Sequence, residues 1–464
     1  MGRAQMMQRV ISERLATALP VWRETLRCLA VFSPSPNSFS EAAATAVADI
    51  DTRTIQALAA AGFLIRQSDA RYALPLVIAQ LFSEAAPFEP ACRRMIEIYS
   101  GYVRAHAGEF SVLTAEYPNL MRALSIAQFL DPPQFANMTL NLGSFFELRG
   151  DYILWKDLLL QSDRPEGTVH VRARLLLNLA WVCEKLGETE SALKFAHEGL
   201  DLAKDDTGLS IEILAILGHV EMDMGMLSAA HQHLMSGLGL AKKSGSPRGL
   251  LSILVSLSVV ATRLGDLESA NLYIEDGVRL ARERNDPAAL ASLMTNLGVL
   301  LYHQGRFADA VRADEDGLKI ARQIGYSEKQ AALLQAMGGA LIRVGELERA
   351  ESCLTEAIAI ATSIEHRWYI ATIRNSLGHL LVEQNRLEEA VAMFKKTAVE
   401  SPPDSPDVRG YAIFGLAGAL ARAGKQSEAR QAANDSIEIF SAIQHHAAAE
   451  VRRWMQSIEG VTAQ

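Results

Sequence analysis

The stretch NLGVLLYHQGRFADAV, residues 296–311, places Gly298 inside an apolar pattern of helical spacing and Gly305 where that pattern ends. A glycine inside a helix costs about 1 kcal/mol relative to alanine, because its backbone loses more conformational freedom on folding. Gly305 suits the left-handed conformation that ends many helices. A helix that tolerates Gly298 must gain something from the missing side chain, and the surrounding sequence indicates what that is.

The same arrangement recurs along the chain at steps of about 40 residues, a spacing typical of helical repeats. A turn residue stands at Gly187, Gly225, Gly265, Gly305, Gly345, Asn385 and Gly424. Five positions later the residue is always alanine, namely Ala192, Ala230, Ala270, Ala310, Ala350, Ala390 and Ala429. Seven positions before the turn it is always small, namely Ala180, Gly218, Ser258, Gly298, Gly338, Gly378 and Ala417. A degenerate earlier copy has Gly143, Gly150 and Trp155.

Each unit predicts two amphipathic helices joined by a tight turn. The glycines inside first helices together cost about 4 to 5 kcal/mol, against a net domain stability of about 5 to 15 kcal/mol. These glycines are Gly143, Gly218, Gly298, Gly338 and Gly378. The cost is tolerable if the bare positions let the helices of one hairpin approach closely, while neighbouring leucines bury for about 1.5 to 3 kcal/mol each. We therefore expect Gly298 to be a packing residue.

This register of small residue, turn glycine and alanine resembles the tetratricopeptide repeat (TPR), whose usual unit has about 34 residues. The longer unit resembles the long-helix variant of bacterial signalling proteins. HEAT repeats also have about 40 residues, but they lack the glycine–alanine register. The resemblance implies a mainly α fold, an α-solenoid of about eight 40-residue TPR-like helical hairpins that forms a superhelix.

Residues before Asp131 lack the repeat and predict a separate domain. Helical patterns cover 20–32, 39–47 and 51–62, and residues 63–75 alternate around a turn as a β-hairpin does. Three helices and a hairpin predict a small winged-helix-like domain. The predicted organisation is a winged-helix-like domain at 1–86, a helical bridge at 87–132, the TPR superhelix at 133–441 and a C-terminal capping helix at 442–464, which carries Trp454.

The N-terminal segment also resembles the winged helix of bacterial STAND-type NTPase regulators. The resemblance rests on LRCLAVFSPSPNSFSEAAATAV (26–47) and ARYALPLVIAQLFSEA (70–85), then on LTAEYPNLMRAL (113–124), which looks like that family's bridge, and FFELRGDYILWKDLL (145–159), which looks like its first repeat. In such regulators an upstream module binds ATP and the repeats sense a ligand or partner. This chain has no GxxxxGK[ST] motif. Either it is the C-terminal part of a longer protein or it works without a nucleotide.

Charge and composition exclude several classes of function. The 464 residues carry 45 basic and 54 acidic side chains, so no global field would attract nucleic acid or an anionic membrane. Residues 51–61, the recognition helix of a winged helix, offer one arginine, so we do not expect DNA contact. The four cysteines lack metal-like or disulfide-like spacing, and the longest apolar stretch, 250–261, is too short for a bilayer. We expect a cytoplasmic protein with no membrane contact.

Catalytic motifs are absent from the sequence. HExxH, GxSxG and GxGxxG do not occur, so we predict no enzyme, no cofactor and no catalytic residue. The pairs His231 and His233, and His445 and His446, come closest to metal-like spacing. Side chains two residues apart on a helix diverge, so we interpret the first pair as surface histidines and expect no metal.

Candidate ligand-binding residues follow from the repeat, because first helices line the concave side of a TPR superhelix. The TPR resemblance implies that asparagines in first helices hydrogen-bond a peptide backbone, and arginines recur two residues before the turn. The candidates are Asn141, Asn178, Trp181, Arg263, Asn296, Tyr302, His303, Arg343, His379 and Arg422. The asparagines could instead bridge neighbouring helices, and the arginines could be solvated charges. Arginines in a groove would favour an acidic or carboxylate-ended segment.

The leading hypothesis is a non-catalytic sensor module of a STAND-like signalling or transcription regulator. Its partner would be a protein or a peptide bound on the concave face, or an upstream NTPase module that this chain lacks. Two alternatives remain at this stage. One is a free-standing TPR receptor for a short peptide signal, and the other is a scaffold that organises a larger assembly.

Overall fold

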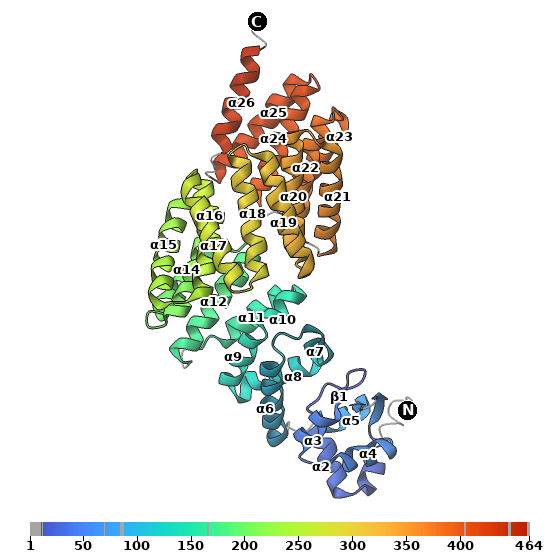
Figure 1. The fold of residues 1–464 in the computed structure, drawn as a ribbon. Helices are drawn as coiled ribbons and strands as arrows, with labels where there is room; N and C mark the ends of the chain where they lie inside the picture. The colour runs from blue at the N-terminus through green and yellow to red at the C-terminus, as the bar shows by residue number, and fades with distance from the viewer. Residues whose placement is uncertain are drawn as a thin grey trace. The chain divides into compact units, whose positions relative to one another are not determined.

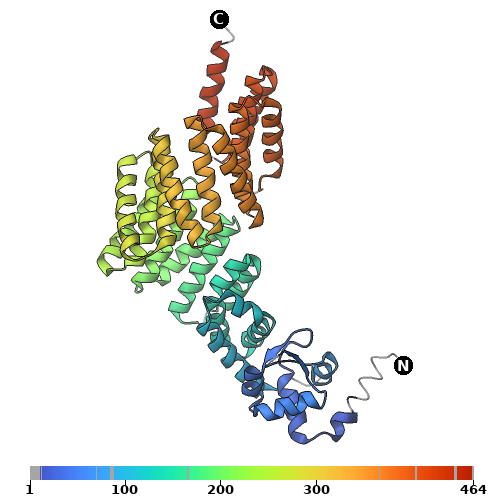
Figure 2. The same cartoon turned by 45° about the vertical axis from the view of Figure 1, so that its right-hand side comes forward.

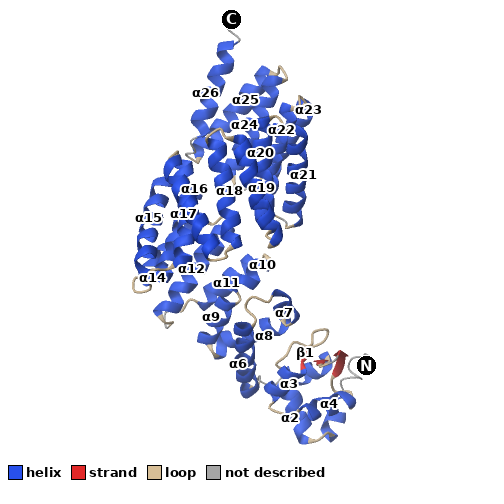
Figure 3. Cartoon of the chain, in the orientation of Figure 1, coloured by secondary structure: helices blue, strands red, loops and turns tan. Residues whose placement is uncertain are grey.

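The computed structural model describes residues 11, 13–68, 70–83, 88–164, 167–364, 366–402, 405–443 and 447–461. Helices dominate these residues, and the strands form one small sheet in the N-terminal part (Figure 3). The chain divides into two compact units, unit 1 (residues 1–203) and unit 2 (residues 204–464). Every described helix is too short or too polar to span a bilayer. The predicted boundaries at 86, 132 and 441 are a finer division and stay a prediction.

Unit 1 begins with helices around a three-stranded sheet. The helices are α2 (Pro20–Leu29), α3 (Glu41–Ala48), α4 (Thr52–Ala60) and α5 (Leu76–Ser83), and the strands are β1 (Phe39–Ser40), β2 (Ile65–Ser68) and β3 (Arg71–Ala73). The antiparallel pair β2–β3 confirms the predicted hairpin, and β1 pairs with the other edge of β3. The expected helix at 39–47 is corrected at its start. Ser40 ends β1 and its hydroxyl accepts a hydrogen bond from the backbone N–H of Ala43, which caps α3.

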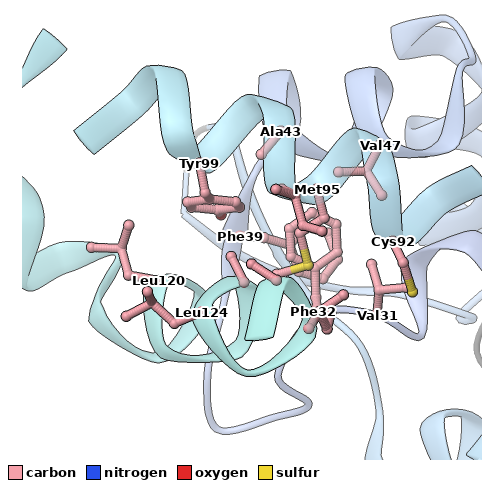
Figure 4. Packing of buried hydrophobic residues seen from close by; sticks show 14 of the residues in the cluster. Val31, Phe32, Phe39, Ala43, Val47, Cys92, Met95, Tyr99, Leu120 and Leu124 are labelled. Carbon is pink, nitrogen blue, oxygen red and sulfur yellow. The ribbon is translucent and has the colours of Figure 1, made fainter. Parts of the chain in front are cut away.

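The core of this N-terminal part joins residues that lie far apart in the sequence. The rings of Phe32 and Phe39 stack with centroids 4.4 Å apart, and Tyr99 meets Phe32 edge-on at 6.4 Å. Figure 4 shows Met95 and Tyr99 on one helix facing these rings, and Leu120 of a neighbouring helix belongs to the same cluster. The two helices are α6 (Glu89–Ala105) and α8 (Tyr117–Leu130). The sheet domain and the predicted bridge therefore share one apolar core.

A buried carboxylate ties the sheet to the bridge. Glu116, just before α8, is 4% exposed, and its side chain accepts hydrogen bonds from Arg71 of β3 at 2.5 Å, Tyr99 of α6 at 2.8 Å and Asn119 of α8 at 2.9 Å. Arg71 and Asn119 also donate to the carbonyl of Ser38. Because a buried charge is tolerated when it is paired and hydrogen-bonded, this network holds three elements in fixed register.

The rest of unit 1 contains the first helical hairpins. It consists of α7 (Phe110–Ala115), α9 (Pro132–Asn141), α10 (Gly143–Arg149), α11 (Tyr152–Ser162), α12 (Val169–Lys185) and α13 (Thr189–Leu202). The degenerate first repeat differs from a regular unit because its first helix is split at Leu142 into α9 and α10. A Cβ added to Gly143 would lie 2.8 Å from the ring of Trp155, so the bare position accommodates this indole.

Unit 2 is a series of helical hairpins, coloured from green to red in Figure 1 and seen from a second angle in Figure 2. The first helices of the hairpins are α14 (Thr207–Asp223), α16 (Pro247–Leu264), α18 (Pro287–His303), α20 (Ser327–Val344), α22 (Arg367–Glu383) and α24 (Pro406–Arg422). The second helices are α15 (Leu227–Ser244), α17 (Leu267–Glu283), α19 (Phe307–Gln323), α21 (Leu347–Ser363), α23 (Leu387–Glu400) and α25 (Gln426–Ala442). A last helix, α26 (Ala447–Val461), packs against α25.

The bare positions of the first helices face the second helix of the same hairpin. A Cβ added to Gly218, Gly338 or Gly378 would lie 2.5 to 2.7 Å from Leu234, Leu354 or Phe394. Each of these side chains lies nine positions after its turn residue. The predicted packing role of the glycines is therefore confirmed, because any side chain there would displace the partner that fills the space.

The remaining repeat positions behave as the sequence predicts. The seven alanines are at most 1% exposed, and their lack of a larger side chain lets the helices pack closely. The turn glycines have φ between 72° and 90°, as Gly150 and Gly345 show at the extremes, and Asn385 reaches 58°. These are left-handed conformations, in which glycine and then asparagine cost least. The left-handed turn residue therefore ends the first helix at the same position in each repeat.

Candidate binding groove

First helices line the inner face of unit 2. Each first helix from α14 to α24 contacts the next first helix along the chain, whereas successive second helices contact each other far less. A stack of hairpins with this pattern curves toward its first helices, because their spacing is the smaller one. Side chains that point away from the hairpin on the first helices therefore face the concave surface of unit 2.

A groove of about 500 Å³ lies on this face at the C-terminal end. His379 and Glu383 of α22 form one wall, Phe414 and Arg422 of α24 form the other, and Trp454 of α26 closes one side. The Trp454 ring meets Phe414 edge-on, with centroids 5.6 Å apart. The groove therefore combines an aromatic side with a polar side, as ligand-binding clefts often do.

Two glycines of α24, Gly415 and Gly418, form part of the groove lining. A Cβ added to Gly418 would meet nothing within 4 Å, whereas one added to Gly415 would lie 2.4 Å from the Phe394 ring. Gly415 is therefore a packing glycine, but Gly418 leaves open space that the groove uses. Gly418 stands six positions before its turn residue, the same register as His379 and Gly339. This register position points to the concave surface rather than into the hairpin.

The charges in the groove are paired on its surface. Arg422 Nη1 lies 2.8 Å from Glu383 Oε1, and both side chains are 49% exposed. An exposed ion pair contributes about 0 to 1 kcal/mol, so a ligand carboxylate can compete with Glu383 for the guanidinium. The His379 side chain is exposed to the groove. Desolvation by the surrounding protein lowers the pKa of its imidazole, and the nearby charge of Glu383 opposes this shift. The imidazole is therefore mainly neutral at pH 7 and can donate or accept one hydrogen bond.

Two of the predicted ligand residues, His379 and Arg422, meet in this groove. Three others gather around Phe307 of α19. The ring centroids of Tyr302 and Phe307 lie 5.1 Å apart, and the Arg343 guanidinium carbon lies 5.0 Å from the Phe307 centroid. The ring centroids of His303 and Tyr302 lie 6.2 Å apart, in an edge-on arrangement. All three side chains are exposed, so this aromatic group is a second polar-aromatic surface on unit 2.

Other predicted residues bridge elements within the protein. The Asn296 amide donates to Ser258 Oγ at 2.8 Å and to the Val255 carbonyl at 3.2 Å, so it links α18 to α16. Arg263 donates to the Met222 carbonyl at 3.2 Å. The bridging alternative therefore describes Asn296 in this structure. A role for either residue in ligand binding stays a prediction.

The last three predicted residues belong to unit 1. Asn178 donates to the carbonyl of Arg174 in its own helix at 2.8 Å, and Asn141 is the half-buried last residue of α9. The Trp181 ring lies 5.7 Å from that of Trp155, and the Lys185 ammonium lies 5.3 Å from Trp181. A role for these three residues in ligand binding stays a prediction.

Sequence reasoning missed Phe414, Glu383 and Gly418 as groove residues. The signal for Gly418 was available, because it occupies the register of His379 and its glycine has no packing partner. Phe414 lies in the groove beside Trp454 of α26, and Glu383 lies there paired with Arg422 of the next first helix; the repeat pattern encodes neither contact.

One wider hollow and the described histidine pair at 231 and 233 differ from this groove. A wider groove of about 890 Å³ lies between the second helices α17 and α19, but Arg279, Arg306 and Arg312 in its lining pair with acidic neighbours, as Arg306 does with Asp309 at 2.7 Å. Among the described residues, no three His, Cys, Asp or Glu side chains converge on a possible metal position. His233 pairs with Glu221 at 2.8 Å, and His445 and His446 lie outside the described residues.

Repeated hairpins with a groove on their inner face define a helical-repeat protein. Sequence models of known families identify the repeat. Models described as tetratricopeptide repeat match residues 175–210, 288–363, 329–398 and 375–442. The chain therefore contains tetratricopeptide repeats, at residues 175–210 and 288–442. Residues 222–304 match the model of anaphase-promoting complex subunit 5, and no curated protein matches the chain in sequence.

Solved structures with the same fold share little sequence with this chain. A STAND protein with a tetratricopeptide repeat sensor from Pyrococcus horikoshii has TM-score 0.64 and 15% identity, and the match covers 97% of this chain and 67% of that chain. A Rap protein complexed with Competence and Sporulation Factor has TM-score 0.58 and 12% identity over 75% of this chain and 98% of that chain. The quorum sensor NprR from B. thuringiensis, in its apo form, has TM-score 0.53 and 15% identity over 74% and 98%.

Proposed function

We propose that this chain is a non-catalytic sensor module that binds a protein or peptide segment on the concave face of unit 2. The observation that carries the proposal is the groove between α22, α24 and α26, where Arg422, His379, Phe414 and Trp454 surround open space above Gly418. An aromatic side and one exchangeable cation suit a segment that ends in an apolar side chain and a carboxylate.

The architecture supports a regulator rather than an isolated repeat array. The fold likeness to the STAND protein extends over 97% of this chain and so includes the N-terminal sheet domain. We propose the division into a winged-helix-like domain, a bridge, the repeats and a capping helix, with an NTPase module as the partner of the N-terminal part. We further propose that the protein works in the cytoplasm. Its four cysteines are free thiols, which fits a reducing compartment.

A free-standing receptor for a short peptide is the second candidate. The fold likeness to the Rap protein and to NprR favours it, and the solved Rap structure contains Competence and Sporulation Factor. Those matches extend over about three quarters of this chain. Under this candidate the same groove binds the ligand, but the N-terminal domain needs no NTPase partner.

Filling the groove tests the site. We would screen the full chain against a library of random decapeptides with free C-terminal carboxylates and measure affinity by fluorescence anisotropy. Gly418→Leu should weaken the selected peptides by about tenfold or more, because the new side chain fills the groove where an added Cβ meets nothing. Gly239→Leu is the matched control, because it introduces the same side chain at an open position of the second helix α15.

The carboxylate can be tested separately. Arg422→Ala should lower affinity by about fivefold to tenfold for free-acid peptides and have less effect on the same peptides with an amidated C-terminus. Affinity that both Gly418→Leu and Arg422→Ala leave unchanged would reject the groove. Binding that Gly339→Leu abolishes instead would move the site to the same register on α20.

A further inference from the structure

Asp314 occupies a position that neighbouring repeats fill with apolar side chains. It lies on α19, nine positions after the turn residue Gly305, and is 1% exposed. The equivalent residues in four other hairpins of unit 2 are Leu234, Ile274, Leu354 and Phe394. All four are buried, so Asp314 places a carboxyl group where the fold otherwise requires hydrocarbon.

One oxygen of the Asp314 carboxyl group lacks a hydrogen-bond donor. Asp314 Oδ1 is buried without a hydrogen-bond partner. It lies over the bare position of α18, where a Cβ added to Gly298 would be 2.1 Å away. Three residues further along α19, the apolar side chains of Met294 from α18 and Leu333 from α20 pack on Gly317.

Charged groups on the packed helices lie near the helix ends. On α18 the titratable residues are Tyr302 and His303, in its last turn, and on α20 they are Glu328, Lys329 and Arg343 in its first and last turns. On α19 itself they are Asp309, Arg312, Glu315, Asp316, Lys319 and Arg322, each of which has an exposed or paired side chain. Burial alone raises the pKa of Asp314 well above its ordinary value of 3.8.

We propose that Asp314 makes the α18–α19 hairpin a proton-gated weak point of unit 2, which stays packed while the carboxyl keeps its proton and opens more readily when the proton leaves. The proposal is independent of the ligand groove. Opening would also break the hydrogen bonds by which Asn296 links α18 to α16. The protonation of Asp314 would therefore also affect the concave face of the neighbouring hairpin.

The direction of the pH effect follows from proton linkage. In the open hairpin Asp314 is solvated and has its ordinary pKa near 3.8, whereas burial raises the pKa in the packed hairpin. Between these two values the packed state holds one proton more than the open state. The stability of the hairpin is therefore full below the lower pKa and falls as pH rises toward the higher one. Each pH unit in this window multiplies the opening equilibrium by about ten.

Hydrogen exchange of the full chain between pH 5 and pH 8 tests this inference. After correction for the intrinsic pH dependence of exchange, amides of α18 and α19 should exchange up to about tenfold faster per pH unit within the window. The α22–α23 hairpin, which has Phe394 at the equivalent position, should not show this extra slope and serves as the internal control.

Two variants make the outcome decisive. Asp314→Asn keeps the size and polarity but cannot titrate, so the extra slope should disappear. Asp314→Leu introduces the residue found in two equivalent hairpins, and exchange of α18 and α19 at pH 8 should become at least about tenfold slower. A wild-type slope equal to that of Asp314→Asn, or faster exchange in Asp314→Leu, would overturn the proposal.

Discussion

The N-terminal part of unit 1 and the hairpins of unit 2 are stabilised in different ways. In unit 1, one core joins α2, α6, α8 and the sheet, and Glu116 collects hydrogen bonds from three elements. In unit 2, four hairpins repeat one short-range fit between a bare glycine position and the side chain opposite, such as Gly378 and Phe394. Non-local contacts therefore make the first region cooperative, while the second is a sum of similar local units.

The largest expected effect is the loss of the Glu116 network. Glu116→Ala should destabilise unit 1 by about 3 kcal/mol, because it leaves Arg71 and Tyr99 without their buried acceptor. Hydrogen exchange should accelerate through α6 and α8 and stay unchanged in α18 to α25. Glu109→Ala, which removes an exposed carboxylate paired with His106, is the control. Equal acceleration of hydrogen exchange in both units would contradict the view that they are stabilised in different ways.

An intermediate effect should separate packing glycines from the groove glycine. Gly378→Ala should destabilise unit 2 by about 1 to 2 kcal/mol, because the added methyl would lie 2.6 Å from the Phe394 ring. Gly418→Ala should instead stabilise it by up to about 1 kcal/mol, because alanine favours the helix and meets nothing within 4 Å. Chemical denaturation measures both changes. The same sign for both variants would contradict the assignment of the two glycines.

The smallest effects belong to the turns. Gly305→Ala should cost about 1 kcal/mol, because φ is 74° and alanine is strained in the left-handed region. Asn385→Gly should change stability by no more than about 0.5 kcal/mol, because asparagine already tolerates its φ of 58°. Thermal denaturation of the pair checks the order. A larger loss for Asn385→Gly would mean that the asparagine side chain, rather than the backbone conformation, matters at this turn.

The segment at 113–124 shows that a sequence resemblance can mark important residues without revealing what their side chains do. Residues 113–124 resemble the bridge of STAND-type regulators, and the structure supplies a physical reason for several of their side chains. Glu116 and Asn119 belong to the buried network, while Leu120 and Leu124 pack in the shared core. The sequence pattern could not reveal these roles, because Ser38, the acceptor for Arg71 and Asn119, lies about 80 residues away.

Sequence alone determined the mainly helical fold, the hairpins of unit 2, their left-handed turns and the packing role of Gly218, Gly338 and Gly378. These features depend on residues close together in the chain, so periodicity records them directly. Only the tertiary structure decided that Gly418 lines a groove, that Asn296 bridges two helices and that Asp314 is buried without a partner for Oδ1. The physical reason is that burial and the partners of polar groups depend on how several separate helices pack together.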